Sequence, residues 1–142
     1  MRKIFKMYAL LGTILLLTGC GSKEPQTLEL ALDSNQTTGY SWTLTQEEEL
    51  FDVNEEYIVD ENDENMTGVG GQQIFTLEPK EAGTTKLTFR YSRSWEEEND
   101  EDTVVTYTVK VSKSKQIEIQ AATFAGGDDI NELPTVPQPT IK

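Results

Sequence analysis

The sequence predicts an all-β protein, an antiparallel β-sandwich, because apolar and polar side chains alternate with a period of two over much of the chain. Four segments show this alternation clearly, at residues 28–33, 40–45, 86–91 and 105–111. A period of two places successive side chains on opposite faces of a strand, so that each segment has one face for a core and one for solvent. No segment shows the apolar repeat of a convincing amphipathic helix.

Two further segments, residues 51–59 and 72–78, alternate less regularly and complete a set of six strands. Turn-forming residues separate neighbouring strands at residues 46–49 and 79–83. Short connections between strands that all reverse direction are typical of an antiparallel arrangement.

The end of the domain is less well marked by the sequence. Residues 116–120 alternate well enough for a short additional strand at an edge. Residues 121–142 contain Gly126-Gly127 and three prolines, a composition typical of a flexible tail. The domain is therefore expected to span residues 27–120, with a tail at 121–142.

Three of the connections are expected to meet at one end of the sandwich. Because each strand reverses direction, loop one (residues 34–39), loop three (60–71) and loop five (92–102) lie at the same end. The plain turns near Glu48 and Lys80 lie at the other end. Loops gathered at one end of a rigid sandwich form a ready binding face.

Loop one has a composition that lets it hold its own shape. Asn35 and Gly39 tolerate positive φ, and the two threonines between them can hydrogen-bond to the local backbone. Loop five offers Trp95, a residue type enriched at binding hot spots. Trp42, in contrast, alternates within a strand, so we assign it to the core.

Three motifs in these loops carry a resemblance to a known family. They are Asn35-Gln36-Thr37-Thr38-Gly39-Tyr40, Gly68-Val69-Gly70-Gly71 and Arg93-Ser94-Trp95. The chain resembles the chagasin-type (I42) inhibitors of papain-like cysteine proteases, whose pattern is N-P-T-T-G-Y, then G-x-G-G, then R-P-W. The resemblance covers about residues 27–111. It implies an immunoglobulin-like sandwich with three binding loops at one end and no enzymatic activity.

The resemblance also implies a mechanism, which is reversible and non-covalent blocking of the active-site cleft of a papain-like cysteine protease. Loop one would enter the catalytic centre, and loops three and five would grip the cleft on either side. The protease-binding residues that the resemblance assigns are Asn35, Gln36, Thr37, Thr38, Gly39, Tyr40, Gly68, Val69, Gly70, Gly71, Arg93, Ser94 and Trp95.

The chain departs from the family pattern at two positions. Gln36 and Ser94 replace prolines, so that two fixed φ angles are lost and the free loops are expected to lose more entropy on binding. The family also has a strand ahead of residue 27, for which this chain leaves little room.

The first residues of the chain are typical of export. Three basic residues precede an apolar run that is too short for a comfortable membrane span. Residues 17–20, Leu-Thr-Gly-Cys, resemble the lipobox of bacterial lipoproteins, which predicts cleavage after residue 19 and a diacylglycerol on Cys20. Residues 20–26 would then tether the domain to the outer face of a membrane in the cell envelope. The alternative is a plain secretory signal with a chance cysteine.

The predicted exported domain is strongly acidic. The whole chain has 12 Lys and Arg, 25 Asp and Glu, and a formal charge of −13. Removing residues 1–19 leaves nine basic residues and a formal charge of −16. There is no basic residue between Lys23 and Lys80, which argues against nucleic acid or anionic lipid headgroups as partners. Membrane attachment would then depend on the lipid.

The composition excludes several kinds of catalytic site. The chain has no His and one Cys, which rules out Ser-His-Asp, Cys-His and His-ligated metal sites. An EF-hand register that starts at Asp60 would need Gly at Asn65 and Glu at Gly71, so the acidic runs are interpreted as solvated loops. We expect no metal and no cofactor.

Two functions from different classes are therefore consistent with the sequence. The first is a lipid-anchored, monomeric inhibitor of papain-like cysteine proteases. The second is an immunoglobulin-like envelope lipoprotein that binds another protein or ligand, with its loop motifs retained for shape. A test for inhibition of a papain-like protease distinguishes the two.

Overall fold

The computed structural model describes residues 23–60, 70–126 and 136–142. Within them the chain forms strands and one short 3-10 turn, which agrees with the predicted all-β class. The elements are β1 (Leu28–Ser34), η1 (Gln36–Thr38), β2 (Tyr40–Gln46), β3 (Phe51–Val59), β4 (Gly71–Pro79), β5 (Gly83–Arg93), β6 (Thr103–Val111), β7 (Ile117–Ala125) and β8 (Thr140–Ile141).

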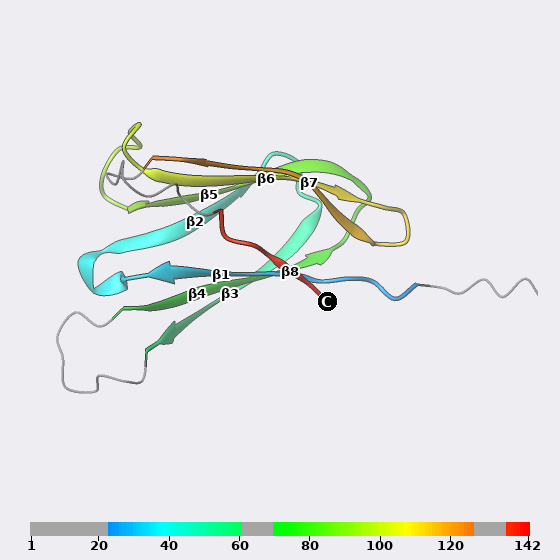
Figure 1. The fold of residues 1–142 in the computed structure, drawn as a ribbon, viewed down its shortest axis with the longest axis horizontal. Helices are drawn as coiled ribbons and strands as arrows, with labels where there is room; N and C mark the ends of the chain where they lie inside the picture. Colours follow the sequence, from blue (N-terminus) through cyan, green and yellow to red (C-terminus); the bar gives the residue numbers. More distant parts are fainter. Residues whose placement is uncertain (1–22, 61–69, 127–135) are drawn as a thin grey trace, which may run out of the picture.

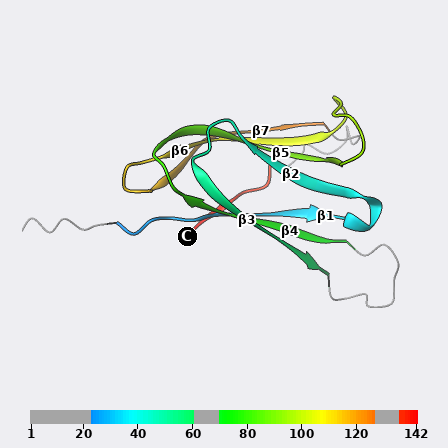
Figure 2. The same cartoon turned by 180° about the vertical axis from the view of Figure 1, so that it is seen from behind.

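The strands make two four-stranded antiparallel sheets that stack face to face (Figure 1). One sheet has the order β3-β4-β1-β8, and the other has the order β2-β5-β6-β7. The same two layers are visible from behind (Figure 2). Consecutive strands β1 and β2 lie in different sheets, so loop one passes from one layer to the other.

The core consists of the inward-facing side chains that the alternation predicts. Edge-to-face contacts join the two sheets and the strands within them, with ring centroids 5.1 Å apart for Phe75 and Phe89 and 5.9 Å apart for Phe89 and Tyr107. Trp42 is 8% exposed, which confirms its assignment to the core. Burial raises the pKa of the Tyr107 hydroxyl to about 12, because the charged form would lose its hydration.

The prediction of a flexible tail at residues 121–142 is wrong for the two parts of that segment that the structure describes, since both contain strand residues. Strand β7 continues to Ala125 and pairs with β6, with a register irregularity between Thr108 and Val109. The backbone ladder holds this edge strand while most of its side chains stay exposed, so its sequence shows no clear alternation. Residues 127–135 lie outside the described part of the chain.

Strand β8 closes the other edge of β1. Leu28 pairs with Ile141, and the backbones of Thr27 and Lys142 exchange two hydrogen bonds of 2.9 Å. Ahead of β8, the carbonyl of Pro137 accepts a hydrogen bond from the Tyr107 hydroxyl, which belongs to the other sheet. The segment that holds β8 therefore contacts both sheets.

A buried glutamine joins the two sheets beneath loop one. The side-chain oxygen of Gln73, on β4, accepts hydrogen bonds from the backbone N–H of Trp42 at 2.8 Å and from the Ser34 hydroxyl at 2.9 Å. Its amide nitrogen donates to the Trp42 carbonyl at 3.0 Å and to Glu55 at 2.7 Å. All four hydrogen-bonding positions of the amide are used, and Gln73 is 0% exposed.

A second glutamine does the same at the opposite end of β2. The side chain of Gln46 donates to the Phe51 carbonyl at 3.0 Å and accepts from the Phe51 N–H at 3.1 Å. Both amides therefore bind the backbone of an edge strand in the way that a neighbouring strand would. Gln73 of β4 binds the backbone of β2, and Gln46 of β2 binds the backbone of β3.

We predict that Gln73→Leu destabilises the domain by roughly 2–4 kcal/mol, because it leaves the backbone groups of Trp42 buried without partners. Chemical denaturation monitored by circular dichroism measures this loss. The matched control is Gln72→Leu on the outer face, where the side chain makes an exposed bond of 3.2 Å to Asp33. That change should stay within about 0.5 kcal/mol, and equal losses in the two variants would contradict the role of Gln73.

Candidate functional site

Loops one and five, which the strand parity groups together, lie at one end of the sandwich, as do the described flanks of loop three (Figure 1). Loop one joins β1 to β2, and loop five joins β5 to β6. Loop three is described only at its flanks, where the N–H of Asp60 donates to the carbonyl of Gly70 at 3.2 Å. Gly68 and Val69, which the sequence assigns to the binding face, lie outside the described residues.

Loop one is a single 3-10 turn closed by its own hydrogen bonds. The N–H of Thr38 donates to the Asn35 carbonyl at 3.1 Å, and the Thr38 hydroxyl donates to the same oxygen at 2.6 Å. The Thr37 hydroxyl donates to the side-chain oxygen of Asn35. Gly39 then ends the turn in the left-handed region with a φ of 84°. The loop thus has the self-bonded form that its threonines and its glycine indicate.

A side chain at position 39 would also collide with the ring of Trp95 from loop five. A Cβ at this position would fall closer to Cη2 of Trp95 than real Cβ atoms come, and 3.0 Å from Cζ2. The indole therefore lies against the backbone of loop one, yet Trp95 remains 69% exposed. Trp95 is not a core residue, and the glycine that it contacts directly follows the exposed tip residues Thr37 and Thr38.

Arg93 and Tyr40, both assigned to protease binding, contact each other within the domain, and Arg93 also contacts loop one. The Nε of Arg93 donates to the carbonyl of Thr38 at 3.3 Å, and its guanidinium lies 4.4 Å from the centre of the Tyr40 ring. Arg93 also pairs with Glu96 at 3.0 Å. The pKa of Arg93 is raised, chiefly by the hydrogen bond to Glu96. Partial burial opposes this rise, and the charges of Tyr40 and Glu96 add to it. Arg93 therefore stays charged at the base of both loops.

The described glycines of loop three differ from each other. Gly71 is buried at the start of β4, where a Cβ would meet the carbonyl of Ile58 and would lie 2.8 Å from the Tyr57 hydroxyl oxygen. Gly70 has open space on its Cβ side, with only the Ser34 carbonyl at 3.8 Å. Gly71 thus serves close packing, and Gly70 lies nearer the surface.

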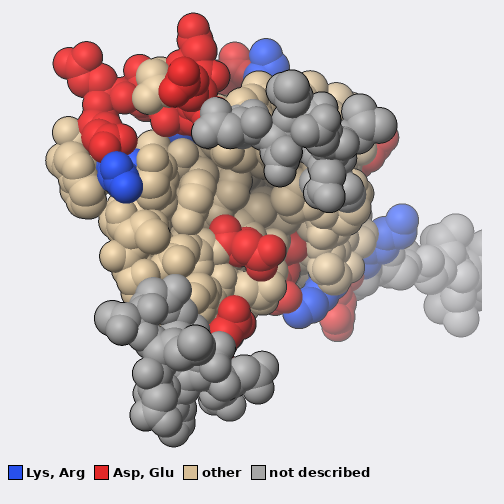
Figure 3. Space-filling model, turned by 60° about the vertical axis from the view of Figure 1, so that its left-hand side comes forward, with Lys and Arg blue, Asp and Glu red and all other residues tan. Residues whose placement is uncertain are grey.

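The acidic run of loop five is shaped by one arginine of β5. Arg90 pairs with Asp102 at 3.0 Å and with Glu98 at 3.6 Å, and it donates to the Asn99 carbonyl at 3.4 Å. Acidic side chains gather over this loop in Figure 3. Among the described residues, no group of three or more His, Cys, Asp or Glu is arranged to hold a metal ion.

Loop one stands between two hollows at this end. One, of about 360 Å³, lies toward the flanks of loop three and is lined by Asp33, Ser34, Asn35, Asp60, Gly70, Gly71 and Tyr91. The other, of about 370 Å³, lies toward loop five and is lined by Tyr40, Tyr91, Glu96, Asn99, Glu101, Asp102 and Thr103. The residues on either side of the turn, Asn35 and Tyr40, therefore each line one of the two hollows.

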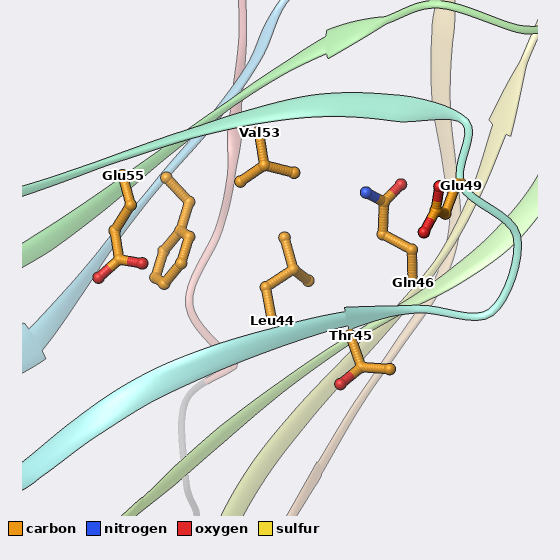
Figure 4. A pocket seen from close by; sticks show the side chains of 7 residues that line it. Leu44, Thr45, Gln46, Glu49, Val53 and Glu55 are labelled. Carbon is orange, nitrogen blue, oxygen red and sulfur yellow. The ribbon is translucent and has the colours of Figure 1, made fainter. Parts of the chain in front are cut away.

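A further cleft, of about 360 Å³, opens elsewhere, between the edge strands β2 and β3 (Figure 4). Apolar side chains, among them Leu44 and Val53, line its middle, and Gln46, Glu49 and Glu55 line its rim. None of the residues that the sequence assigns to binding lines this cleft.

Comparisons with known proteins identify the family. The sequence model of the family described as Chagasin family peptidase inhibitor I42 matches residues 23–111, more than half of the chain. The chain belongs to the chagasin family of peptidase inhibitors. The matched residues contain β1 to β6 and therefore all three loops, whereas β7 and β8 lie beyond the match.

Individual members of the family agree with this result. Amoebiasin-1 of Entamoeba histolytica is 31% identical over 84 residues, a match that covers 59% of this chain and 78% of that protein. Chagasin of Trypanosoma cruzi is 35% identical over 74 residues, which covers 48% of this chain and 66% of chagasin. The solution structure of amebosin is 29% identical with a TM-score of 0.51, over 63% of this chain and 83% of amebosin. The sandwich is the immunoglobulin-like fold of the chagasin family.

Sequence reasoning missed the residues that support the loops from below. Tyr91, on β5, accepts a hydrogen bond from the N–H of Asn35 at 2.9 Å. Gln73 binds Ser34 and Trp42 beneath loop one, and Arg90 pairs with Asp102 of loop five. The spacing of two between Tyr91 and Arg93 was the available signal, because it places both on one face of a strand.

We predict that Gly39→Ala displaces the ring of Trp95 and destabilises the domain by about 1 kcal/mol, because Ala at positive φ is strained and its Cβ overlaps the indole. The indole NMR signal of Trp95 and the melting temperature measure the two effects. Gly70→Ala is the control, since its Cβ has room. An unmoved Trp95 signal in Gly39→Ala would contradict the contact between loops one and five.

Proposed function

We propose that the protein is a reversible, non-covalent inhibitor of papain-like cysteine proteases and has no enzymatic activity of its own. The observation that carries the proposal is the contact between the Trp95 indole and Gly39, beside the exposed tip of loop one. This contact joins two of the three family motifs into one surface, and membership of the chagasin family supports a peptidase as the target.

The shape of loop one supports entry into a catalytic centre without cleavage. Its exposed tip offers small, uncharged side chains, so that the backbone can come close to a catalytic cysteine. The turn is closed by the bonds from Thr38 to Asn35 and from Gly39 to Gln36. A peptide held in such a turn does not present its carbonyl in the near-attack geometry that acyl transfer requires.

Trp95 is proposed as the main anchor of loop five on one side of the cleft. A large, rigid and exposed aromatic side chain provides contact area at little entropic cost. Gly68, Val69 and Gly70 of loop three are proposed to run along the other wall, and Gly71, which is buried at the start of β4, to support them from behind. Gln36 and Ser94, exposed beside these anchors, are proposed as peripheral contacts.

We predict that residues 23–142 inhibit papain or a cathepsin competitively, and that Trp95→Ala raises the inhibition constant thirty-fold to several hundred-fold. A central Trp anchor carries roughly 2–4 kcal/mol, and about 1.4 kcal/mol corresponds to one decade. Thr38→Arg should weaken inhibition further, because a bulky charged side chain prevents the loop tip from fitting against the catalytic cysteine.

The control is Glu48→Lys in the turn at the opposite end, which should change the inhibition constant little beyond a modest effect on association rate. Failure of the wild-type domain to inhibit several papain-like proteases at micromolar concentration would refute the proposal. A loss of inhibition in Glu48→Lys as large as that in Trp95→Ala would also refute it. The alternative of an envelope module for another ligand is not favoured by the family match.

We also propose that the protein is anchored by a lipid on Cys20 to the outer face of a membrane in the cell envelope and acts as a monomer. Cys20 and the proposed signal peptide at residues 1–19 lie outside the described residues. In the described part of the chain, no helix has the length and apolar character to cross a membrane. Residues 23–27 leave the sandwich away from the loops, which supports an orientation with the binding face toward solvent (Figure 1).

The anchor is tested by Cys20→Ser, which removes the acceptor sulfur. We expect the wild-type protein to enter the detergent phase on extraction and the variant to enter the aqueous phase. Unchanged partitioning of the variant would rule out lipidation at Cys20.

A further inference from the structure

We propose that Tyr91 is a positioning residue that, together with Arg93, holds loop one in the shape that inhibits. The inference rests on the proposed inhibitory function and assigns a role to a residue outside the three motifs. It depends on contacts that β5 makes with both sides of the loop one turn.

The first contact is at the entrance of loop one. The hydroxyl oxygen of Tyr91 accepts a hydrogen bond of 2.9 Å from the N–H of Asn35. Asn35 has a φ of −122° and a ψ of 85°, so the chain changes from strand to turn at this residue. The phenol therefore binds loop one at the residue where its direction is set.

The Tyr91 ring is itself held in place by its neighbours on β2. It stacks on Tyr40 with centroids 5.3 Å apart and packs against the buried Trp42 at 4.9 Å. The register of the sheet pairs Trp42 with Tyr91 and Tyr40 with Arg93. A ring fixed on two sides gives its hydroxyl a defined position beneath Asn35.

The second contact is near the tip. Arg93 is two residues further along β5, on the same face as Tyr91, and donates to the carbonyl of Thr38. The strand thus accepts a hydrogen bond at the start of the turn and donates one at its end. Two such points fix the turn relative to β5, whereas the bonds within loop one fix only its internal shape.

This chain needs such support because Gln36 stands where the family pattern has proline. Proline would set φ at the first residue of the turn before binding, and Gln does not. Affinity falls by the fraction of molecules whose loop is in the competent shape. The bonds from β5 raise that fraction by holding the backbone on either side of Gln36.

The experiment removes one oxygen atom. In residues 23–142, Tyr91→Phe keeps both ring contacts and deletes the bond to Asn35. We expect the inhibition constant against papain to rise five- to thirty-fold, amide hydrogen exchange at Asn35 to accelerate at least ten-fold, and the melting temperature to change little. Tyr107→Phe is the matched control, since it also deletes a phenol-to-backbone bond, to Pro137, and should leave the inhibition constant unchanged.

A second change separates positioning from direct contact with the protease. Gln36→Pro is compatible with the turn, because the first residue of a helical turn has no intrahelical partner for its N–H and the residue before it is outside the helical region. Added to Tyr91→Phe, it should restore most of the lost inhibition. Added to the wild type, whose loop one the Tyr91 bond already holds, it should strengthen inhibition by a smaller factor than it does in Tyr91→Phe.

Each outcome decides the matter. If Gln36→Pro does not restore the inhibition lost in Tyr91→Phe, the Tyr91 hydroxyl belongs to the protease interface and the positioning role is overturned. Unchanged amide exchange at Asn35 in Tyr91→Phe would also overturn it. If the wild type inhibits no papain-like protease, the proposed function fails. Accelerated exchange at Asn35 would still establish that Tyr91 holds the loop.

Discussion

The structure depends on one buried amide, that of Gln73. Loop one leaves β1 of one sheet at Ser34 and enters β2 of the other, and Ser34 and Trp42 of β2 both bond to this side chain. The loop therefore starts and finishes on the same group, which belongs to the opposite layer from β2. Replacing four bonds to water by four internal bonds costs little when all of them form, and much when one is missing. The amide thereby fixes the spacing of the sheets where the loops emerge.

Support continues outward from this point in layers. The aromatic side chains of β2 and β5 pack on one another beside the Trp42 backbone that Gln73 binds. Tyr91 and Arg93 bond from β5 to loop one, and Arg90 pairs with acidic residues of loop five. Each layer restricts the next, so that much of the entropy of ordering the loops is lost during folding rather than during association. Small, uncharged tip residues can then face a partner without large ordered side chains of their own.

Alternation and strand parity are local rules, so the sequence allowed most strands to be predicted. It also predicted the grouping of loops one and five with the flanks of loop three, and the exposure of Trp95. It did not reveal β8, which is held by backbone bonds to β1 that leave no mark on its composition. Gln73 was equally hidden, since a polar residue at an inward position looks like an interruption until its partners from β1, β2 and β3 are known. The orientation of the Arg93 side chain could not be predicted either, because its partners Thr38 and Tyr40 are distant in the sequence and come near it only in the fold.

The glutamines that bind backbone have a consequence for solubility. Open sheet edges invite pairing with other chains, and β2 and β3 are both edges. At Trp42 and Phe51 the backbone groups that would recruit another strand are already occupied by side-chain amides. Carboxylates along β3 add electrostatic repulsion between copies. The sandwich can thus leave two edges without neighbouring strands and still resist the edge-to-edge association that leads to aggregation.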